Sequence, residues 1–419
     1  MENGVWYKVD NVAKVFLASY NRRDTRAFRL TCTLKEKVDS ETLQEALHIT
    51  SMERPQYQVE IHKGLFWHYM EVSEKEVVVK EEFERPCPTL YGPDFRGHLH
   101  YSVTYWGKRI NLEMFHALTD GTGGLEFLNI IIQNYLKLKY PDNFKNLTMY
   151  SGAAYDDLEE NSFSKFYGKS KGNIGKKAGR SYQIRGAKLP YDQQQFFEAH
   201  MSVKDVLAKA KESGSSMTAY LGAVLAMSIY EEMPTLIKNK KPVTISMPVN
   251  LRNFYPSETS RNFFNSIYIS HIFDGSEDIK GLAAEFDAQL KEEIAPETVK
   301  ARMDSFEKLE HFMLIRMVPL FIKNPVVRFF TRKEQSSVSA IVSNVGRIQV
   351  PDEVKPYIES YAGYCSTDKL FITVVSYEDD LVFGIASVYR STRVLKNFIR
   401  TFTSNDIDVT LQATGVLKY

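Results

Sequence analysis

The sequence predicts a mixed α/β protein whose helices pack on mixed β-sheets in two lobes. The chain has 419 residues, well above the roughly 150 residues of a typical domain. Runs that alternate apolar and polar residues, typical of strands, are interleaved with runs of helical periodicity. A basic stretch with several glycines and no acidic residue lies near the middle of the chain and cannot bury much surface. We therefore expect an N-terminal lobe at residues 1–161, an exposed basic interlobe linker at 162–190 and a C-terminal lobe at 191–419.

The N-terminal part alternates strands and helices. Asp39 precedes a helical pattern, and aspartate is favoured at that position. Gly107 and Lys108 separate two β-rich runs, a spacing that predicts a hairpin. The alternation of the second run, continued by two residues, puts His116 on its apolar face. The strands that we expect here are residues 28–34, 57–62, 66–69, 77–79, 98–106 and 109–115.

The C-terminal part is again mixed. An interior proline removes a backbone donor and clashes with the preceding turn, so Pro296 and Pro319 should break or kink a long helical region. We expect helices at residues 203–212, 218–231, 278–322 and 392–402, and strands at 243–248, 340–343, 370–376 and 381–387.

Composition limits the classes of function. The net charge of +1 gives no strong positive field, so we expect no nucleic acid partner. The three cysteines lie far apart without a CxxC spacing, which argues against a metal site or a disulfide framework and favours the cytoplasm. The N-terminal residues do not resemble a secretory signal. The longest apolar run, residues 218–230, is shorter than the ~20 residues needed to cross a bilayer. We expect a soluble, monomeric, cytoplasmic protein.

The most informative motif is HALTDG, residues 116–121, between a predicted strand and a predicted helix. A histidine at a strand end is held firmly, and an ordinary pKa near 6.5 leaves it largely neutral and able to accept a proton at pH 7. This suits a general base. The alternative is that Asp120 or Thr122 caps the helix while His116 is a satisfied core residue. Spacing alone leaves both interpretations open.

HALTDG resembles the HxxxDG signature shared by chloramphenicol acetyltransferases, plant BAHD acyltransferases, nonribosomal condensation domains and alcohol acetyltransferases. Residues 54–69 resemble the alcohol acetyltransferase branch, and residues 247–264 and 343–346 resemble further elements of the superfamily. Phe115 stands where many relatives have the first histidine of HHxxxDG, and the plant DFGWG element is missing. The resemblance is therefore closest to the alcohol acetyltransferase branch.

The resemblance implies two chloramphenicol-acetyltransferase-like lobes with an active-site tunnel between them. The substrates would be acyl-CoA and a small alcohol or amine, without a permanently bound cofactor or metal. It implies His116 as the general base and Asp120 as a structural residue paired with Arg252. Gly121 would let the chain turn where a side chain would collide. Ser343 and Asn344 are candidate oxyanion or substrate donors, and a turn after a strand is the alternative for that segment.

Several alternatives stay open. The acyl donor could be a carrier protein rather than free CoA, or the scaffold could be a non-catalytic binding protein. The basic residues 165–188 could receive the phosphates of CoA, although a solvated loop is the favoured interpretation. Residues 314–330 mix apolar and basic side chains and could make peripheral contact with a membrane or line an entrance for an apolar acceptor. Core packing with a basic outer face is the interpretation that we favour for them.

Overall fold

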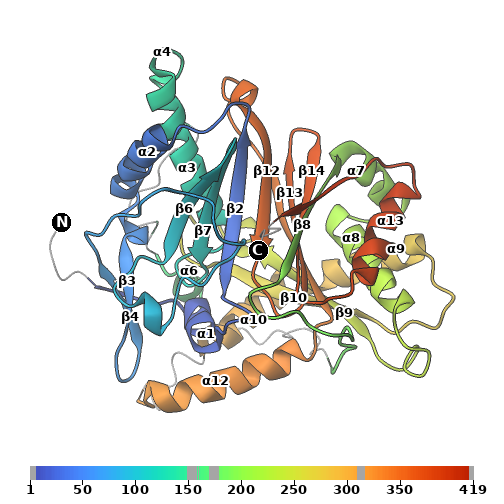
Figure 1. Ribbon diagram of the computed structural model, residues 1–419. Coiled ribbons are helices and arrows are strands. Elements are labelled where there is room, and N and C mark those ends of the chain that lie inside the picture. The colour runs from blue at the N-terminus through green and yellow to red at the C-terminus, as the bar shows by residue number, and fades with distance from the viewer. Residues whose placement is uncertain (1–5, 149–157, 159, 169–178, 309–316, 415–419) are drawn as a thin grey trace.

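The computed structural model describes residues 6–148, 158, 160–168, 179–308 and 317–414, which form a mixed α/β fold of two lobes side by side (Figure 1). The strands form three sheets, with the orders β1-β4-β3, β12-β2-β7-β6-β5 and β10-β9-β11-β13-β14-β8-β15. The predicted fold class is confirmed. No helix in these described stretches is both long and apolar enough to span a membrane.

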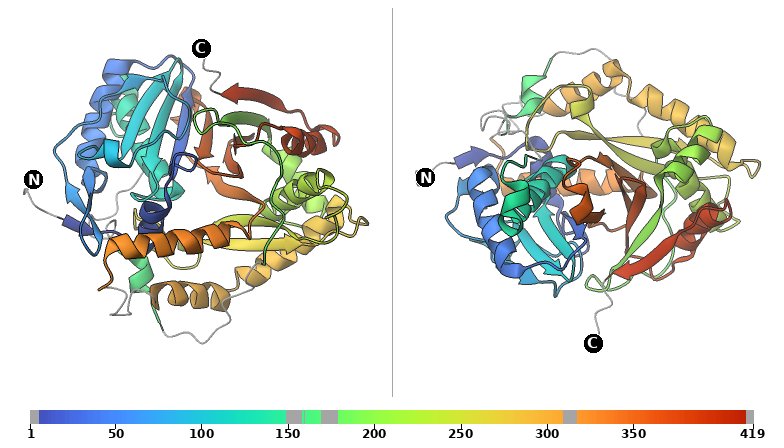
Figure 2. Two further views of the ribbon diagram at one scale, coloured as in Figure 1. Left: turned by 60° about the horizontal axis from the view of Figure 1, so that its bottom comes forward. Right: turned by 90° about the horizontal axis from the view of Figure 1, so that it is seen from above.

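The N-terminal lobe is built on the five-stranded sheet, with helices α2 and α3 against one of its faces (Figure 2). The sheet face toward these helices carries Ile110, Leu112 and Met114, all fully buried. The predicted hairpin is present, since β6 and β7 pair antiparallel around Gly107 and Lys108. The strands and helices of this half are β1 (Trp6–Lys8), α1 (Asn11–Ser19), β2 (Ala27–Leu34), α2 (Ser40–Glu53), β3 (Val59–Lys63), β4 (His68–Val72), β5 (Lys80–Glu81), β6 (Tyr101–Trp106), β7 (Arg109–Phe115), α3 (Gly121–Lys139), α4 (Pro141–Phe144) and α6 (Ser162–Lys165).

The C-terminal lobe is built on the seven-stranded sheet, whose core packs against α8, α9 and α13. Pro296 ends the first part of the long helical region, as predicted, because it begins α10. The remaining elements are β8 (Gln195–Ser202), α7 (Val203–Glu212), α8 (Met217–Glu231), β9 (Val243–Asn250), β10 (Phe264–His271), α9 (Ile279–Glu293), α10 (Pro296–Lys308), α12 (Leu320–Gln335), β11 (Ala340–Ile348), β12 (Ile358–Cys365), β13 (Leu370–Tyr377), β14 (Asp380–Ser387), α13 (Arg393–Thr403) and β15 (Thr410–Thr414).

One strand connects the two lobes. β12 belongs to the second half of the chain but pairs with β2 in the sheet of the N-terminal lobe. Strand β12 also lies so close to the second sheet that a Cβ on Gly384 would be 1.8 Å from the carbonyl oxygen of Gly363. The predicted division into lobes at 162–190 therefore assigns β12 to the lobe whose sheet it does not join. For the other elements this division stays a prediction.

Some details of the sequence prediction were wrong. The linker is not simply exposed, because Phe163 and Tyr182 are both buried in hydrophobic clusters. The strand expected at 77–79 lies instead at β5. Four elements near the lobe junction had no strong pattern and were missed, namely α1, β8, β10 and β12.

Candidate active site

His116 follows β7, the middle strand of the first sheet, and its backbone N–H donates to the carbonyl of Arg26 at 2.8 Å. The half-buried imidazole is surrounded by aromatic rings from both halves of the chain. Its centroid lies 4.5 Å from that of Phe16, 5.0 Å from Phe28 and 5.6 Å from Phe264. Burial lowers the pKa of His116, while the charge of Asp120 and a hydrogen bond to Asn262 oppose this shift. The ring is therefore neutral at pH 7.

Asn262 fixes which nitrogen of this ring carries the proton. Its Nδ2 donates to the backbone carbonyl of His116 at 2.9 Å and to the carboxylate of Asp10 at 3.3 Å. Its Oδ1 is thus the acceptor and lies 3.0 Å from Nδ1 of His116. Because Nδ1 donates to this oxygen, Nε2 keeps the lone pair that a general base needs. Asn262 and Asp10 were both missed, since the bonds that join Asn262 to His116 and to Asp10 span 146 and 252 residues of sequence.

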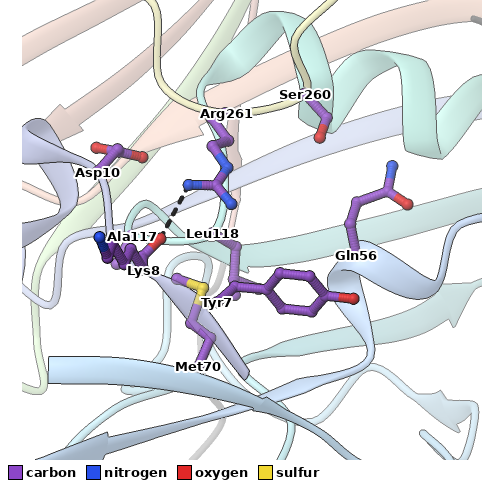
Figure 3. Close-up of a pocket in the computed structure, with 9 residues that line it drawn as sticks. All are labelled: Tyr7, Lys8, Asp10, Gln56, Met70, Ala117, Leu118, Ser260 and Arg261. Atoms are coloured by element: carbon purple, nitrogen blue, oxygen red, sulfur yellow. Dashed lines mark hydrogen bonds between the residues drawn. The ribbon is translucent and has the colours of Figure 1, made fainter. Parts of the chain in front are cut away.

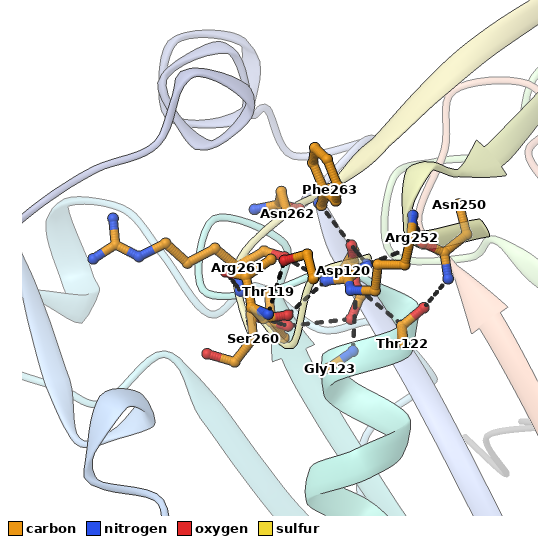
Figure 4. Close-up of polar contacts among 12 residues, drawn as sticks. Thr119, Asp120, Thr122, Gly123, Asn250, Arg252, Ser260, Arg261, Asn262 and Phe263 are labelled. Atoms are coloured by element: carbon orange, nitrogen blue, oxygen red, sulfur yellow. Dashed lines mark hydrogen bonds and ion pairs between the residues drawn. The ribbon is translucent and has the colours of Figure 1, made fainter. Parts of the chain in front are cut away.

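Asp120 connects the first lobe to the second (Figure 4). One carboxylate oxygen caps α3 by accepting from the backbone of Thr122 at 3.1 Å and of Gly123 at 3.2 Å. The other accepts from Nη1 of Arg252 at 2.7 Å and from the backbone N–H of Phe263 at 2.8 Å. Asp120 is buried, and the structure brings its carboxylate to both the start of α3 and the guanidinium of Arg252.

Arg252 organises the loop that carries Asn262. It lies in a 3-10 turn at Leu251–Asn253, directly after β9. Its Nη2 donates to the carbonyls of Thr259 and Arg261, each at 2.8 Å. The hydroxyl of Thr119 donates to the carbonyl of Ser260 in the same loop. The loop that positions the imidazole is therefore held by residues of the HALTDG segment.

The steric reason predicted for Gly121 is wrong. It is the first residue of α3, its φ is not positive, and a Cβ would meet nothing within 4 Å. The two following helical glycines are the restricted ones. A Cβ added at Gly123 would lie 2.7 Å from the carbonyl oxygen of Ser260, and one added at Gly124 would lie 2.6 Å from the ring of Phe28. Close packing of α3 against the site thus requires the glycines after the motif.

Ser343 and Asn344 lie within β11, which continues to Ile348, so the alternative of a turn is wrong. The strand bulges after Asn344, whose side chain accepts from the backbone of Gly346 at 2.9 Å and donates to Thr218 at 2.9 Å. No hydrogen bond between described residues joins either candidate to His116. Their role as oxyanion donors stays a prediction.

A small pocket opens at the motif (Figure 3). It is lined by Tyr7, Lys8, Asp10, Gln56, Met70, Ala117, Leu118, Ser260 and Arg261. Its volume of about 10 Å³ admits roughly one water molecule. It is not a substrate tunnel, and phenylalanine rings surround His116 in this structure. The interlobe tunnel stays a prediction. Part of the basic segment suggested for CoA phosphates, residues 169–178, lies outside the described residues.

No protein-family model and no curated protein matches the chain. Solved structures do match over nearly the whole length. Polyketide synthase associated protein 5 from Mycobacterium tuberculosis has a TM-score of 0.61 at 14% identity, covering 96% of this chain and 98% of that one. F. sporotrichioides TRI101 in complex with coenzyme A and T-2 has a TM-score of 0.62 at 10% identity, covering 98% and 100%.

A third match is a condensation domain. The first condensation domain of the CDA synthetase has a TM-score of 0.61 at 13% identity, covering 95% of each chain. At these identities the likeness establishes the architecture. The chain therefore has the two-lobed fold of these three structures.

Proposed function

We propose that the protein transfers an acyl group from an acyl-CoA thioester to an alcohol or amine. The observation that carries this proposal is the imidazole of His116 between the two lobes, with Nδ1 bonded to Asn262 and Nε2 left as the proton acceptor. The general class, a transferase of the acyltransferase and condensation type, agrees with neighbours such as TRI101, which was solved with coenzyme A.

In the proposed reaction, Nε2 of His116 removes the proton from the acceptor hydroxyl or amine as its oxygen or nitrogen attacks the thioester carbonyl. The tetrahedral intermediate then collapses, the C–S bond breaks, and the imidazolium returns the proton to the departing thiolate. The nearby charge of Asp120 favours the protonated ring and thereby stabilises the imidazolium. No acyl-enzyme forms, so the reaction requires no nucleophilic side chain.

The second candidate is a condensation-type transferase that takes its acyl group from a carrier protein. The likeness to the condensation domain of the CDA synthetase favours it as an alternative. A non-catalytic binding role on the same scaffold is disfavoured by the complete HxxxDG motif.

Release of free thiol from a panel of acyl-CoAs, with alcohols and amines as acceptors, tests the proposal. Acyl-CoA use should produce thiol and acylated acceptor in equal amounts. A carrier-dependent enzyme should leave free CoA thioesters intact and consume the acyl group of an acylated carrier domain. A binding protein should turn over neither donor.

A further inference from the structure

The outer face of α12 is apolar, which reverses the pattern of an ordinary surface helix. Residues on a helix advance by about 100° each, so Phe321, Ile322, Val326, Phe329 and Phe330 share one half of its circumference. Phe321, Phe329 and Phe330 are 66%, 65% and 61% exposed. We predicted that residues 314–330 pack into the core and expose a basic face. For residues 317–330, which the structure describes, that prediction is wrong, because the exposed face is largely apolar. We refer to these five residues as the α12 face.

The opposite side of α12 packs against α1 and is the more polar one. Its half-buried residues include Asn324, Val327, Thr331 and Gln335. The apolar side chains of the α12 face thus contribute little to this packing. Figure 2 shows α12 as a long helix across the outside of the molecule, next to α1. Such a contiguous exposed apolar surface marks an interaction site.

A second element extends the α12 face. The backbone N–H of Leu320 donates to the carbonyl of Leu65 at 2.8 Å, and Lys323 donates to that of Phe66 at 3.0 Å. These contacts hold the tip of the β3–β4 hairpin against the start of α12, and both lie along the lower edge of the molecule in Figure 1. Leu65 and Trp67 at this tip are 61% and 56% exposed. Tryptophan is enriched where proteins meet the interface of a bilayer.

The charges beside this surface are mainly positive. Arg328 lies near one edge of the α12 face and Lys323 near the other, while Arg332 and Lys333 fall on the same half of the helix, directly after Phe330. The acidic residue of the helix, Glu334, accepts a hydrogen bond from the hydroxyl of Tyr268. An apolar stripe bordered by lysine and arginine matches the boundary between acyl chains and anionic headgroups.

A second copy of this chain fits the same surface poorly. A twofold dimer would bring the same patch of each copy together, and would therefore set the basic residues of one α12 beside those of the other. Like charges placed opposite one another are unfavourable. An anionic lipid surface supplies instead both the apolar layer and the opposite charge.

We propose that α12 and the tip of the β3–β4 hairpin dock the protein on the surface of an anionic lipid bilayer. The helix lies in the plane of the membrane, its phenylalanines enter the boundary of the acyl chains, and the flanking cations contact the headgroups. The docking is peripheral, and it is independent of the acyl transfer proposed above.

Co-sedimentation of the full chain with lipid vesicles tests this proposal. One set of vesicles contains phosphatidylcholine alone, and the other contains equal parts of phosphatidylcholine and phosphatidylglycerol. The protein should sediment with the anionic vesicles, should bind the neutral ones several times more weakly, and should be released by high salt. Failure to sediment with anionic vesicles at low salt overturns the proposal.

Variants locate the contact. Phe329→Ser with Phe330→Ser should weaken binding to anionic vesicles at least about tenfold, because two exposed aromatic side chains no longer enter the lipid. Arg332→Ala with Lys333→Ala should weaken it by about fivefold per removed charge and reduce the sensitivity to salt. Both pairs are solvent-exposed, so the melting temperature should change little.

The matched control is Phe83→Ser with Val78→Ser, since these side chains are each 62% exposed and lie near the far strand of the first sheet. This variant should bind as the unchanged protein does. Equal losses in the control and the α12 variant would overturn the assignment of the surface. Light scattering that shows a dimer in the unchanged protein and a monomer in the Phe329 and Phe330 variant, without vesicle binding in either, would assign the face to a second copy and contradict the proposal.

Discussion

The carboxylate of Asp120 and the guanidinium of Arg252 lie 2.7 Å apart and join the segment after β7 to the loop after β9. The same loop supplies Asn262, which bonds to His116, and leads into Phe264, whose ring packs near the imidazole. The ion pair therefore acts on the proposed base through the position of the loop, and neither charge needs to contact a substrate.

Replacement of Arg252 by alanine should lower both stability and activity. It leaves Asp120 buried with an uncompensated charge, which typically costs about 3–5 kcal/mol, and it frees the carbonyls of Thr259 and Arg261. Thermal unfolding should show a clearly lower Tm and thiol release should fall. Arg393→Ala, in an exposed and distant ion pair, is the control that should melt normally. An unchanged melting curve for Arg252→Ala would contradict a buried pair.

Gly121 in the motif and Gly124 after it should differ in their tolerance of alanine. Gly121→Ala should leave Tm and turnover nearly unchanged, because its Cβ meets nothing within 4 Å. Gly124→Ala should lower Tm and reduce kcat, because its Cβ would push on the Phe28 ring that packs on His116. Overpacking of this kind costs about 1–3 kcal/mol. If both variants behave alike in thermal unfolding, the packing described for α3 is wrong.

Local features were predictable because short segments determine them. The hairpin around Gly107 and the helix capped by Asp39 follow from patterns within about ten residues, and the structure contains both. HALTDG was recognised by resemblance, together with the pair between Asp120 and Arg252. These predictions required no knowledge of how distant segments meet.

Other features depend on long-range packing. Asn262 meets His116 across 146 residues, and asparagine in a loop carries no distinguishing signal in one sequence. The strand β12 crosses between the halves because its partner is β2, which its own residues do not reveal. For α12, the apolar residues were visible, but periodicity cannot tell whether an apolar stripe faces a core or the solvent.

Asn262 should act as a positioning residue. Asn262→Ala removes the acceptor that keeps the proton on Nδ1, so kcat should fall by about tenfold or more. In the unchanged protein the hydrogen bond to Asn262 raises the pKa of His116. Its loss should lower that pKa, so the acid limb of the kcat/KM profile should move to lower pH in the variant. Asn143→Ala, whose partner is the distant Tyr357 hydroxyl, is the control. A normal pH profile in Asn262→Ala would argue for a purely structural role.

His200 should make stability depend on pH. Burial alone would lower its pKa, but hydrogen bonds and charge from Asp380 and Glu198 raise it from 6.5 to about 9. Because the folded protein binds this proton more tightly, the stabilisation is complete below pH 6.5 and is lost as the pH rises through about 9. It amounts to on the order of 1–3 kcal/mol.

The measurement is the Tm of the unchanged protein and of His200→Gln as a function of pH. The unchanged protein should be the more stable one below pH 6.5, and the difference should shrink as the pH rises past about 9. A difference that grows with pH would have the wrong sign for a proton held between two carboxylates.

The most direct test is the turnover of His116→Ala, measured as thiol release with the best acyl-CoA and acceptor pair. We expect kcat to fall by about 10²–10⁴, the range for a lost general base, while the circular dichroism spectrum and Tm show a retained fold. His48→Ala, an exposed histidine on α2, should react as the unchanged protein does. Undiminished turnover in a folded His116→Ala protein would show that this imidazole is not the base.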